Sequence, residues 1–219
     1  MPKPTRTAGL LHACIVFAAL AACNTSPPPR PAAALPAVDP AIARRYAAIH
    51  DDKHPVPGVD PAVLEPRNVR QLVDFPTSEE PGTIVVDPEA RFLYLVQEGG
   101  KALRYGVGVG KEGLEFKGTA SVNHKAQWPR WTPTRDMIKR EPERYERWAG
   151  GMEGGTDNPL GARALYLFKN GKDTLYRIHG TNEPDTIGQA VSSGCIRMMN
   201  QDVIDLYRRV PNGSKVVVL

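Results

Sequence analysis

The sequence lacks the features of a membrane-spanning, nucleic-acid-binding or disordered chain. Its longest apolar stretch, Leu10 to Leu20, covers about eleven residues, whereas a membrane helix needs roughly twenty. No charge of one sign dominates: 28 Lys and Arg residues against 24 Asp and Glu residues give +4, and the two signs are interleaved. This pattern predicts no nucleic-acid partner. With 41% hydrophobic and 24% charged residues, the chain has enough apolar side chains for a real core.

The N-terminus has the pattern of an export signal that ends at a cysteine. Lys3 and Arg6 precede the apolar stretch, and Leu20-Ala21-Ala22-Cys23 follows it. This resembles bacterial lipoprotein signals, which are cut before a cysteine that then receives lipid. The resemblance implies a signal peptide over residues 1–22 and a lipidated Cys23 that anchors the protein to a membrane, facing the periplasm. A plain secretory signal is the alternative.

Cysteine is scarce, with three in 219 residues, and this makes Cys195 informative. Cys14 lies within the expected signal peptide and Cys23 would carry lipid, so Cys195 is the one cysteine that remains. Exported proteins occupy an oxidising compartment, where cysteines usually form disulfides. Cys195 is therefore either a small buried hydrophobe or a reactive group, and the cysteine count does not decide between them.

Two segments precede the main domain. Residues 23–40 include six prolines in the fifteen residues from Ser26 to Pro40, which favours an extended stalk with no core of its own. In residues 41–80, apolar residues recur at helical spacing around Tyr46 and again around Leu72. These residues are expected to form an appended N-terminal segment of two short helices that dock onto the domain.

Residues 81–219 have the pattern of short strands separated by turns, so we expect a mostly β fold with a few short helices. The expected strands are 83–87, 92–97, 101–109, 119–123, 162–168, 175–179 and 215–219. A helix over 132–149 is broken at Pro142, and a second helix after Asn200 has apolar residues at i, i+3, i+4 and i+7. The glycine-rich residues 150–161 between strands predict a loop.

His179 and Cys195 form the candidate chemical pair. His179 ends a predicted strand, and Cys195 follows sixteen residues later. A cysteine with an ordinary pKa is mostly protonated at neutral pH, so a nucleophilic thiol needs a neighbouring base, and histidine is the usual one. Gly194 permits a tight turn that leaves backbone N–H groups near the sulfur as an oxyanion hole, and the small Ser193 leaves the approach open. A strand-end histidine beside a buried, inert thiol remains the alternative.

The sequence around this pair resembles the YkuD-type L,D-transpeptidase catalytic domain. The resemblance rests on His179-Gly180-Thr181, on Ser192-Ser193-Gly194-Cys195-Ile196-Arg197 and on Asn200, and it extends over residues 82–219. It implies a YkuD-like β-sandwich with a lid-like insertion. Trp128, Trp131 and the loop 150–155 could form that lid, or the two tryptophans could serve packing. Many members carry a second histidine where this chain has Ser193.

The resemblance also implies a reaction. Cys195, with His179 as base and acid and the Gly180 backbone carbonyl orienting the imidazole, would attack a tetrapeptide stem of peptidoglycan and expel the terminal D-alanine. The acyl group would then pass to the amine of a second stem, to a lysine of an envelope protein, or to water in an L,D-carboxypeptidase. No cofactor is expected, and no metal, because Cys195 and His179 are fewer than the four ligands of a structural zinc site.

Alternatives also stay open at Arg197, at Tyr176 and for the function. Arg197 could bind a substrate carboxylate or form a structural salt bridge. Tyr176, expected on the same strand face as His179, could donate to the oxyanion or belong to the core. A papain-like protease is disfavoured because its cysteine precedes its histidine. A non-catalytic, peptidoglycan-binding envelope lipoprotein is the competing interpretation.

Overall fold

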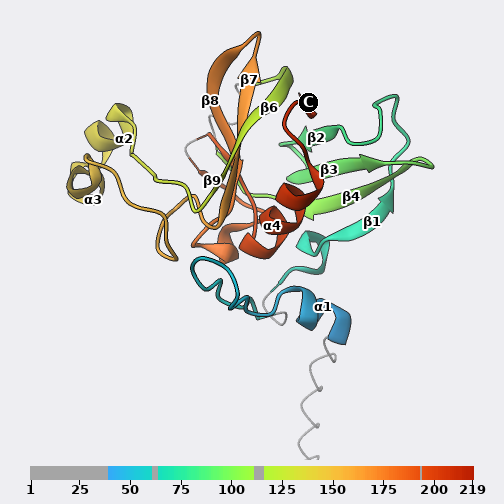
Figure 1. The fold of residues 1–219 in the computed structure, drawn as a ribbon, viewed down its shortest axis with the longest axis horizontal. Coiled ribbons are helices and arrows are strands. Elements are labelled where there is room, and N and C mark those ends of the chain that lie inside the picture. The colour runs from blue at the N-terminus through green and yellow to red at the C-terminus, as the bar shows by residue number, and fades with distance from the viewer. Residues whose placement is uncertain (1–38, 61–63, 111–115, 193) are drawn as a thin grey trace, which may run out of the picture. The chain divides into compact units, whose positions relative to one another are not determined.

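The computed structural model of the protein describes residues 39–60, 64–110, 116–192 and 194–219 (Figure 1). The expected signal peptide, Cys23 and nearly all of the stalk lie outside the described residues, as does Ser193. Among the described residues, no helix is both long enough and apolar enough to cross a bilayer.

A nine-stranded sheet forms the body of the fold, with the strand order β1-β4-β3-β2-β11-β6-β7-β8-β10, and β5 pairs with β9 in a separate small sheet. Most neighbours are antiparallel, but β11 runs parallel to β2 and β10 runs parallel to β8. The strands are β1 (Gln71–Asp74), β2 (Ile84–Asp87), β3 (Phe92–Gln97), β4 (Lys101–Gly106), β5 (Val109–Gly110), β6 (Gly118–Gln127), β7 (Arg163–Lys169), β8 (Lys172–His179), β9 (Ala190–Ser192), β10 (Ile196–Arg197) and β11 (Lys215–Val218). The mostly β fold class is confirmed.

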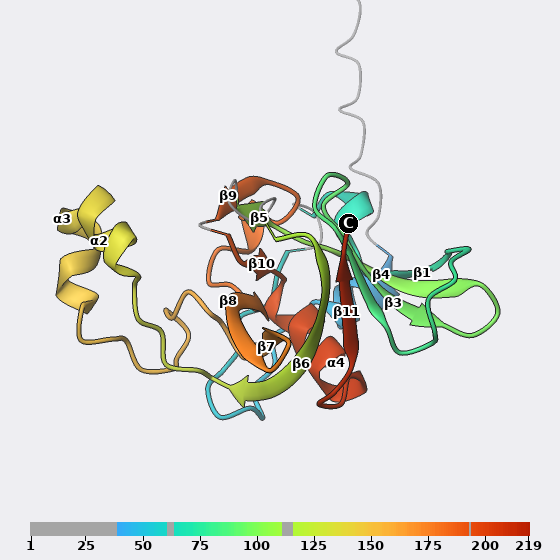
Figure 2. The same ribbon diagram turned by 90° about the horizontal axis from the view of Figure 1, so that it is seen from above.

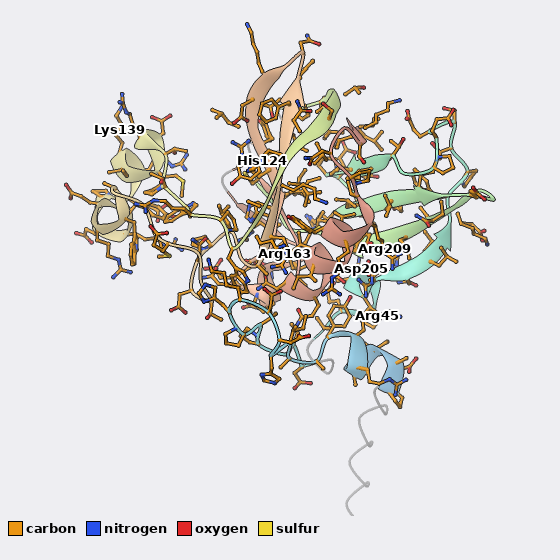
Figure 3. The ribbon with its side chains drawn as sticks, in the orientation of Figure 1. Arg45, His124, Lys139, Arg163, Asp205 and Arg209 are labelled. Atoms are coloured by element: carbon orange, nitrogen blue, oxygen red, sulfur yellow. The ribbon has the colours of Figure 1, made fainter. Side chains whose placement is uncertain are left out.

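Four short α-helices accompany these strands in the described residues: α1 (Pro40–Arg45), α2 (Arg135–Arg140), α3 (Pro142–Tyr145) and α4 (Asn200–Arg209). Single 3-10 turns lie at Pro66–Asn68, Glu146–Trp148 and Pro184–Thr186. The break predicted at Pro142 separates α2 from α3, and both helices stand away from the sheet in Figures 1 and 2. Lys139 on α2 lies within this excursion, at a distance from the sheet (Figure 3).

The main core lies between the two halves of the large sheet. In Figure 2, α4 lies between β6 and β7 on one side and β11 and β3 on the other. One apolar cluster draws on both halves and on α4, for example Leu93 from β3, Leu165 from β7 and Leu206 from α4, all with no exposed surface. The two halves of the bent sheet thus form the two layers of the expected sandwich, and α4 fills the space between them.

The N-terminal segment is built into this fold. The second helix expected around Leu72 is wrong: Gln71–Asp74 form β1, which pairs with β4 at the edge of the sheet and leaves Leu72 60% exposed. A free strand edge offers backbone hydrogen bonds that override a short apolar repeat. Tyr46, by contrast, has no exposed surface, and its hydroxyl accepts from the Arg70 backbone N–H (2.8 Å) and donates to Asp202 of α4 (3.1 Å).

A buried ion pair adds a second connection. Asp52 accepts hydrogen bonds from the Arg163 guanidinium of β7 and from Trp128 Nε1 (2.7 Å), and the side chains of Asp52 and Arg163 are each only 7% exposed. Figure 3 shows Arg163 close to α4, at the side of the sheet facing the N-terminal segment. Residues from Asp39 onward therefore belong to the same folded unit as the strands.

Replacing Asp52 with Ala is expected to lower the free energy of unfolding by roughly 3–5 kcal/mol, because it leaves the Arg163 charge buried without its partner. Urea unfolding followed by circular dichroism measures this change. The control is Asp74→Ala, which breaks the exposed Asp74–Lys101 pair and should cost at most about 1 kcal/mol. Equal effects of the two substitutions would contradict an integral N-terminal segment.

Candidate active site

His179 is the last residue of β8 and is 4% exposed. Its Nδ1 lies 2.6 Å from the Gly180 carbonyl oxygen. A carbonyl can only accept, so Nδ1 carries the proton and Nε2 is left as an acceptor. Burial, with smaller contributions from the Arg197 and Arg177 charges, lowers the pKa of His179 to about 4, although the Gly180 hydrogen bond acts in the opposite direction. The imidazole is therefore neutral at pH 7.

Asn200 holds the backbone that carries this hydrogen bond. Its Oδ1 accepts from the Ala162 N–H and its Nδ2 donates to the Thr181 carbonyl, both at 2.8 Å. A Cβ on Gly180 would lie 2.1 Å from Asn200 Oδ1, so only glycine fits beside the amide. Asn200 is the first residue of α4, Met199 occupies the cap position, and the Asn200 side chain faces the strand ends.

The parallel pairing of β10 with β8 brings Cys195 to the same region. Ile196 pairs with Ile178 and Arg197 with His179, and both isoleucines belong to the main core. Because neighbouring side chains in a strand alternate between faces, Cys195, directly before β10, lies on the face that His179 occupies. The structure thus brings together the two residues that the sequence analysis singled out.

Cys195 is partly exposed, and its Sγ lies 4.0 Å from the Leu175 carbonyl oxygen. Burial raises the pKa of the thiol, while the backbone N–H and the guanidinium of Arg177 act to lower it. The net direction is upward, so the resting group is a thiol that needs a base. Gly194, before the cysteine, has φ +121°, a backbone conformation that side-chain-bearing residues rarely adopt.

Arg197 has features of both alternatives. Its Nη1 donates to Glu183 Oε2 at 3.0 Å, which ties β10 to the loop after His179. Its Nε and Nη2 are buried without a hydrogen-bond partner among the described residues, and the side chain is 11% exposed. The salt bridge is therefore present, and two N–H groups remain for an acceptor such as a carboxylate.

Tyr176 does not share the face of His179. It precedes His179 by three residues and packs against the main core, on the side of Ile178, where its ring lies 4.9 Å from that of Phe116. The expectation of a common face is wrong because an odd spacing along a strand places side chains on opposite faces. The oxyanion role proposed for Tyr176 has no geometric support.

Trp128 is likewise a core residue and not part of a lid. It is 4% exposed, lies in a cluster with Val56, Ala162 and Ile204, and hydrogen-bonds to Asp52. Trp131 forms an isolated bridge with Met152, which connects the start of the excursion to the 150–155 loop. The insertion is the segment 132–148, and the buried Trp128 lies shortly before its N-terminal end.

Sequence reasoning missed Arg177. It lies two residues before His179, so strand alternation alone would have placed it on the same face. Its side chain is 15% exposed, donates to both carboxylate oxygens of Asp173 (2.6 and 2.7 Å), and stacks over the Tyr166 ring at 4.3 Å.

The described residues contain no group of three or more His, Cys, Asp or Glu side chains positioned to hold a metal ion. The chemistry that this site can perform from its own side chains is nucleophilic, with Cys195 as a thiol and His179 as a neutral base on one strand face.

Comparison with known proteins identifies the family of this chain. Residues 81–218 match the YkuD family, described as the L,D-transpeptidase catalytic domain. The probable L,D-transpeptidase ErfK/SrfK of Escherichia coli K12 is 32% identical over 170 residues, which cover 74% of this chain and 53% of that protein. The probable L,D-transpeptidase YbiS of the same strain is 33% identical over 165 residues, which cover 73% and 52%. This chain therefore matches about half the length of these relatives.

A solved structure from Brucella melitensis, titled a probable carnitine operon oxidoreductase, is 55% identical. The similarity covers 71% of this chain and 96% of that chain, with a TM-score of 0.50. The name of that protein is its own; the domain match over residues 81–218 and the Escherichia coli relatives show the family of this chain. The chain belongs to the YkuD family of L,D-transpeptidase catalytic domains.

Proposed function

We propose that the protein is a peptidoglycan L,D-transpeptidase with Cys195 as nucleophile and His179 as general base and acid. The observation that carries the proposal is the pairing of β10 with β8, which puts the thiol on the face of a neutral imidazole whose Nε2 can accept a proton. The family membership supports the reaction class.

The proton transfers follow from the states of the two groups. His179 Nε2 takes the proton of the Cys195 thiol as sulfur attacks the carbonyl carbon before the terminal D-alanine. The resulting imidazolium returns that proton to the departing amine of D-alanine, leaving a thioester on Cys195. Nε2 then removes a proton from the acceptor amine, which attacks the thioester and restores the thiol. The Gly180 carbonyl keeps Nδ1 protonated and the ring oriented throughout.

The substrate is a tetrapeptide stem, and the product is a 3→3 cross-link or an anchored envelope protein. The L,D-transpeptidase names of the relatives support this substrate class. The partly exposed Cys195 is accessible to an acyl donor. Arg197, two residues further along the chain, has two buried N–H groups without a hydrogen-bond partner among the described residues. Gly194, with φ +121°, lets the backbone N–H groups around Cys195 turn towards a developing oxyanion.

Cys195→Ser is expected to abolish D-alanine release and cross-linking, and His179→Ala should reduce both by roughly two to four orders of magnitude. The measurement is analysis of muropeptides from sacculi incubated with the purified protein. His50→Ala, which changes an exposed histidine outside the site, is the matched control and should keep full activity. Wild-type protein that binds sacculi without changing them would favour the non-catalytic interpretation, and stems shortened without cross-links would favour the carboxypeptidase.

The acid limb of the pH profile should lie near pH 4. Because burial lowers the pKa of His179 to about 4, the base stays unprotonated at pH 5. The initial rate of D-alanine release at pH 5 should therefore stay close to that at pH 7, whereas a base with an ordinary histidine pKa would lose about 30-fold. A steep loss between pH 7 and pH 5 in folded protein would show that another group is the base.

Gly180→Ala should inactivate the enzyme by displacing the carbonyl that orients His179. The new Cβ would lie 2.1 Å from Asn200 Oδ1, so either the backbone or Asn200 must move. D-alanine release should fall at least tenfold. Gly150→Ala, at an exposed site with no atom within 4 Å of the added Cβ, is the control and should behave as wild type. Full activity of Gly180→Ala would exclude this positioning role.

We further propose that lipid on Cys23 anchors the protein to a membrane in the cell envelope, with Leu20-Ala21-Ala22-Cys23 as the supporting pattern. Cys23→Ser should move the protein from the membrane pellet to the soluble periplasmic fraction, because the acyl chains are lost while the folded unit from Asp39 onward is untouched. Cell fractionation followed by immunoblotting measures this. Undiminished retention in the membrane pellet would refute the lipid anchor.

A further inference from the structure

The strand β8 contains a bulge beside Cys195. Tyr166 of β7 pairs with Arg177 and Phe168 pairs with Asp173, so three residues of β8, Thr174–Tyr176, lie opposite Leu167 alone. At the centre of the bulge, Leu175 has φ +64° and is 76% exposed. A branched side chain in the left-handed region is strained, and such strain persists only where the surroundings enforce it.

Asp173 enforces the shape of this bulge. Its Oδ1 accepts from the Leu175 backbone N–H at 2.8 Å, while both of its carboxylate oxygens accept from the Arg177 guanidinium at 2.6 and 2.7 Å. The same guanidinium also stacks over the Tyr166 ring, with Cζ 4.3 Å from the ring centroid. The Asp173 carboxylate thus bonds to both Leu175 and Arg177, and these contacts together restrict the Arg177 side chain.

The bulge places a hydrogen-bond acceptor, the Leu175 carbonyl, and a hydrogen-bond donor, the Arg177 backbone N–H, near the Cys195 sulfur. The Leu175 carbonyl, 4.0 Å from Sγ, can accept from the thiol. The Arg177 backbone N–H and guanidinium favour the thiolate. By register, Arg177 is the β8 residue opposite Cys195, one position before the Ile178–Ile196 pair.

We propose that Arg177 is a positioning residue for the reactive sulfur. In the resting site, the thiol donates to the Leu175 carbonyl. When the S–H bond breaks, its proton moves to His179 Nε2, and the sulfur, now a thiolate, accepts from the Arg177 N–H and lies in the field of its guanidinium. No other bond forms or breaks in this step. The inference rests on the proposed role of Cys195.

Arg177 is not the sole charge in this region. Asp173 on β8 neutralises part of its field, Arg197 on β10 lies on the same face, and Glu183 pairs with Arg197. His179 is neutral in the resting site. Asp173 and Arg197 stay in place when Arg177 alone is changed, so the effect of that change reports on the Arg177 guanidinium.

The test measures the pH dependence of Cys195 alkylation by iodoacetamide in the full-length protein, quantified on the Cys195 peptide by mass spectrometry. Arg177→Gln should raise the midpoint of this curve by roughly one pH unit. Arg177→Lys keeps the charge without the two-point pair and should shift it by less than half as much. Arg177→Met, which can still cover the Tyr166 ring, should match Arg177→Gln and guards against misfolding of the latter.

Arg209→Gln is the matched control and should leave the midpoint unchanged. Arg209 forms a similar pair with Asp205 four residues earlier, at 2.8 and 3.0 Å, but both lie on α4 (Figure 3). An unchanged midpoint in folded Arg177→Gln and Arg177→Met, or an equal shift in Arg209→Gln, would overturn the inference. A wild-type thiol that titrates as expected in a protein that releases no D-alanine would instead overturn the proposed function alone.

Discussion

The short parallel pairing between β10 and β8 is the constraint on which the site depends. Only two residues of β10 take part, and the Met198 N–H continues the pairing by donating to the His179 carbonyl at 2.8 Å. Fifteen residues lie between His179 and Cys195 in the sequence, yet this pairing places both on one face. Helix α4 begins at Asn200, directly after this pairing, and packs Val203 and Leu206 into the core. The packing of α4 inside the bent sheet therefore stabilises the pairing of β10 with β8.

The sequence predicted the regular parts of this arrangement well. An apolar run bounded by turns identified the strand that contains Leu93 and Leu95, and the 3.6-residue spacing identified α4, because both patterns reflect burial against the core. His179 and Cys195 could be paired before the structure because an unpaired cysteine is unusual in a protein expected to be exported and because the surrounding motif resembles a known family. Their catalytic roles stay predictions.

Other features depend on contacts between distant residues and leave no local pattern. The Asp52–Arg163 pair joins residues more than a hundred positions apart. Residues 71–74 form β1 because they pair with the free edge of β4, and the local sequence around residues 71–74 does not reveal that partner. Tyr176 was misplaced and Arg177 overlooked for the same reason: Arg177, and not Tyr176, lies two residues before His179 and so shares its face. The bulge at Leu175 ends the regular alternation just before these residues.

The path of the N-terminal segment also determines how the fold would bear a mechanical load. If the protein is tethered through Cys23, tension on the chain enters the described structure at Asp39. It first meets the Tyr46–Asp202 contact, then the Asp52–Arg163 pair, and only afterwards β1 at the edge of the sheet. These connections resist in series, and the first two adjoin the groups that orient His179: Asp202 is two residues after Asn200 on α4, and the Arg163 carbonyl accepts from the Gly180 N–H. Movement of the cell wall relative to the membrane would therefore load the contacts that support the backbone around His179.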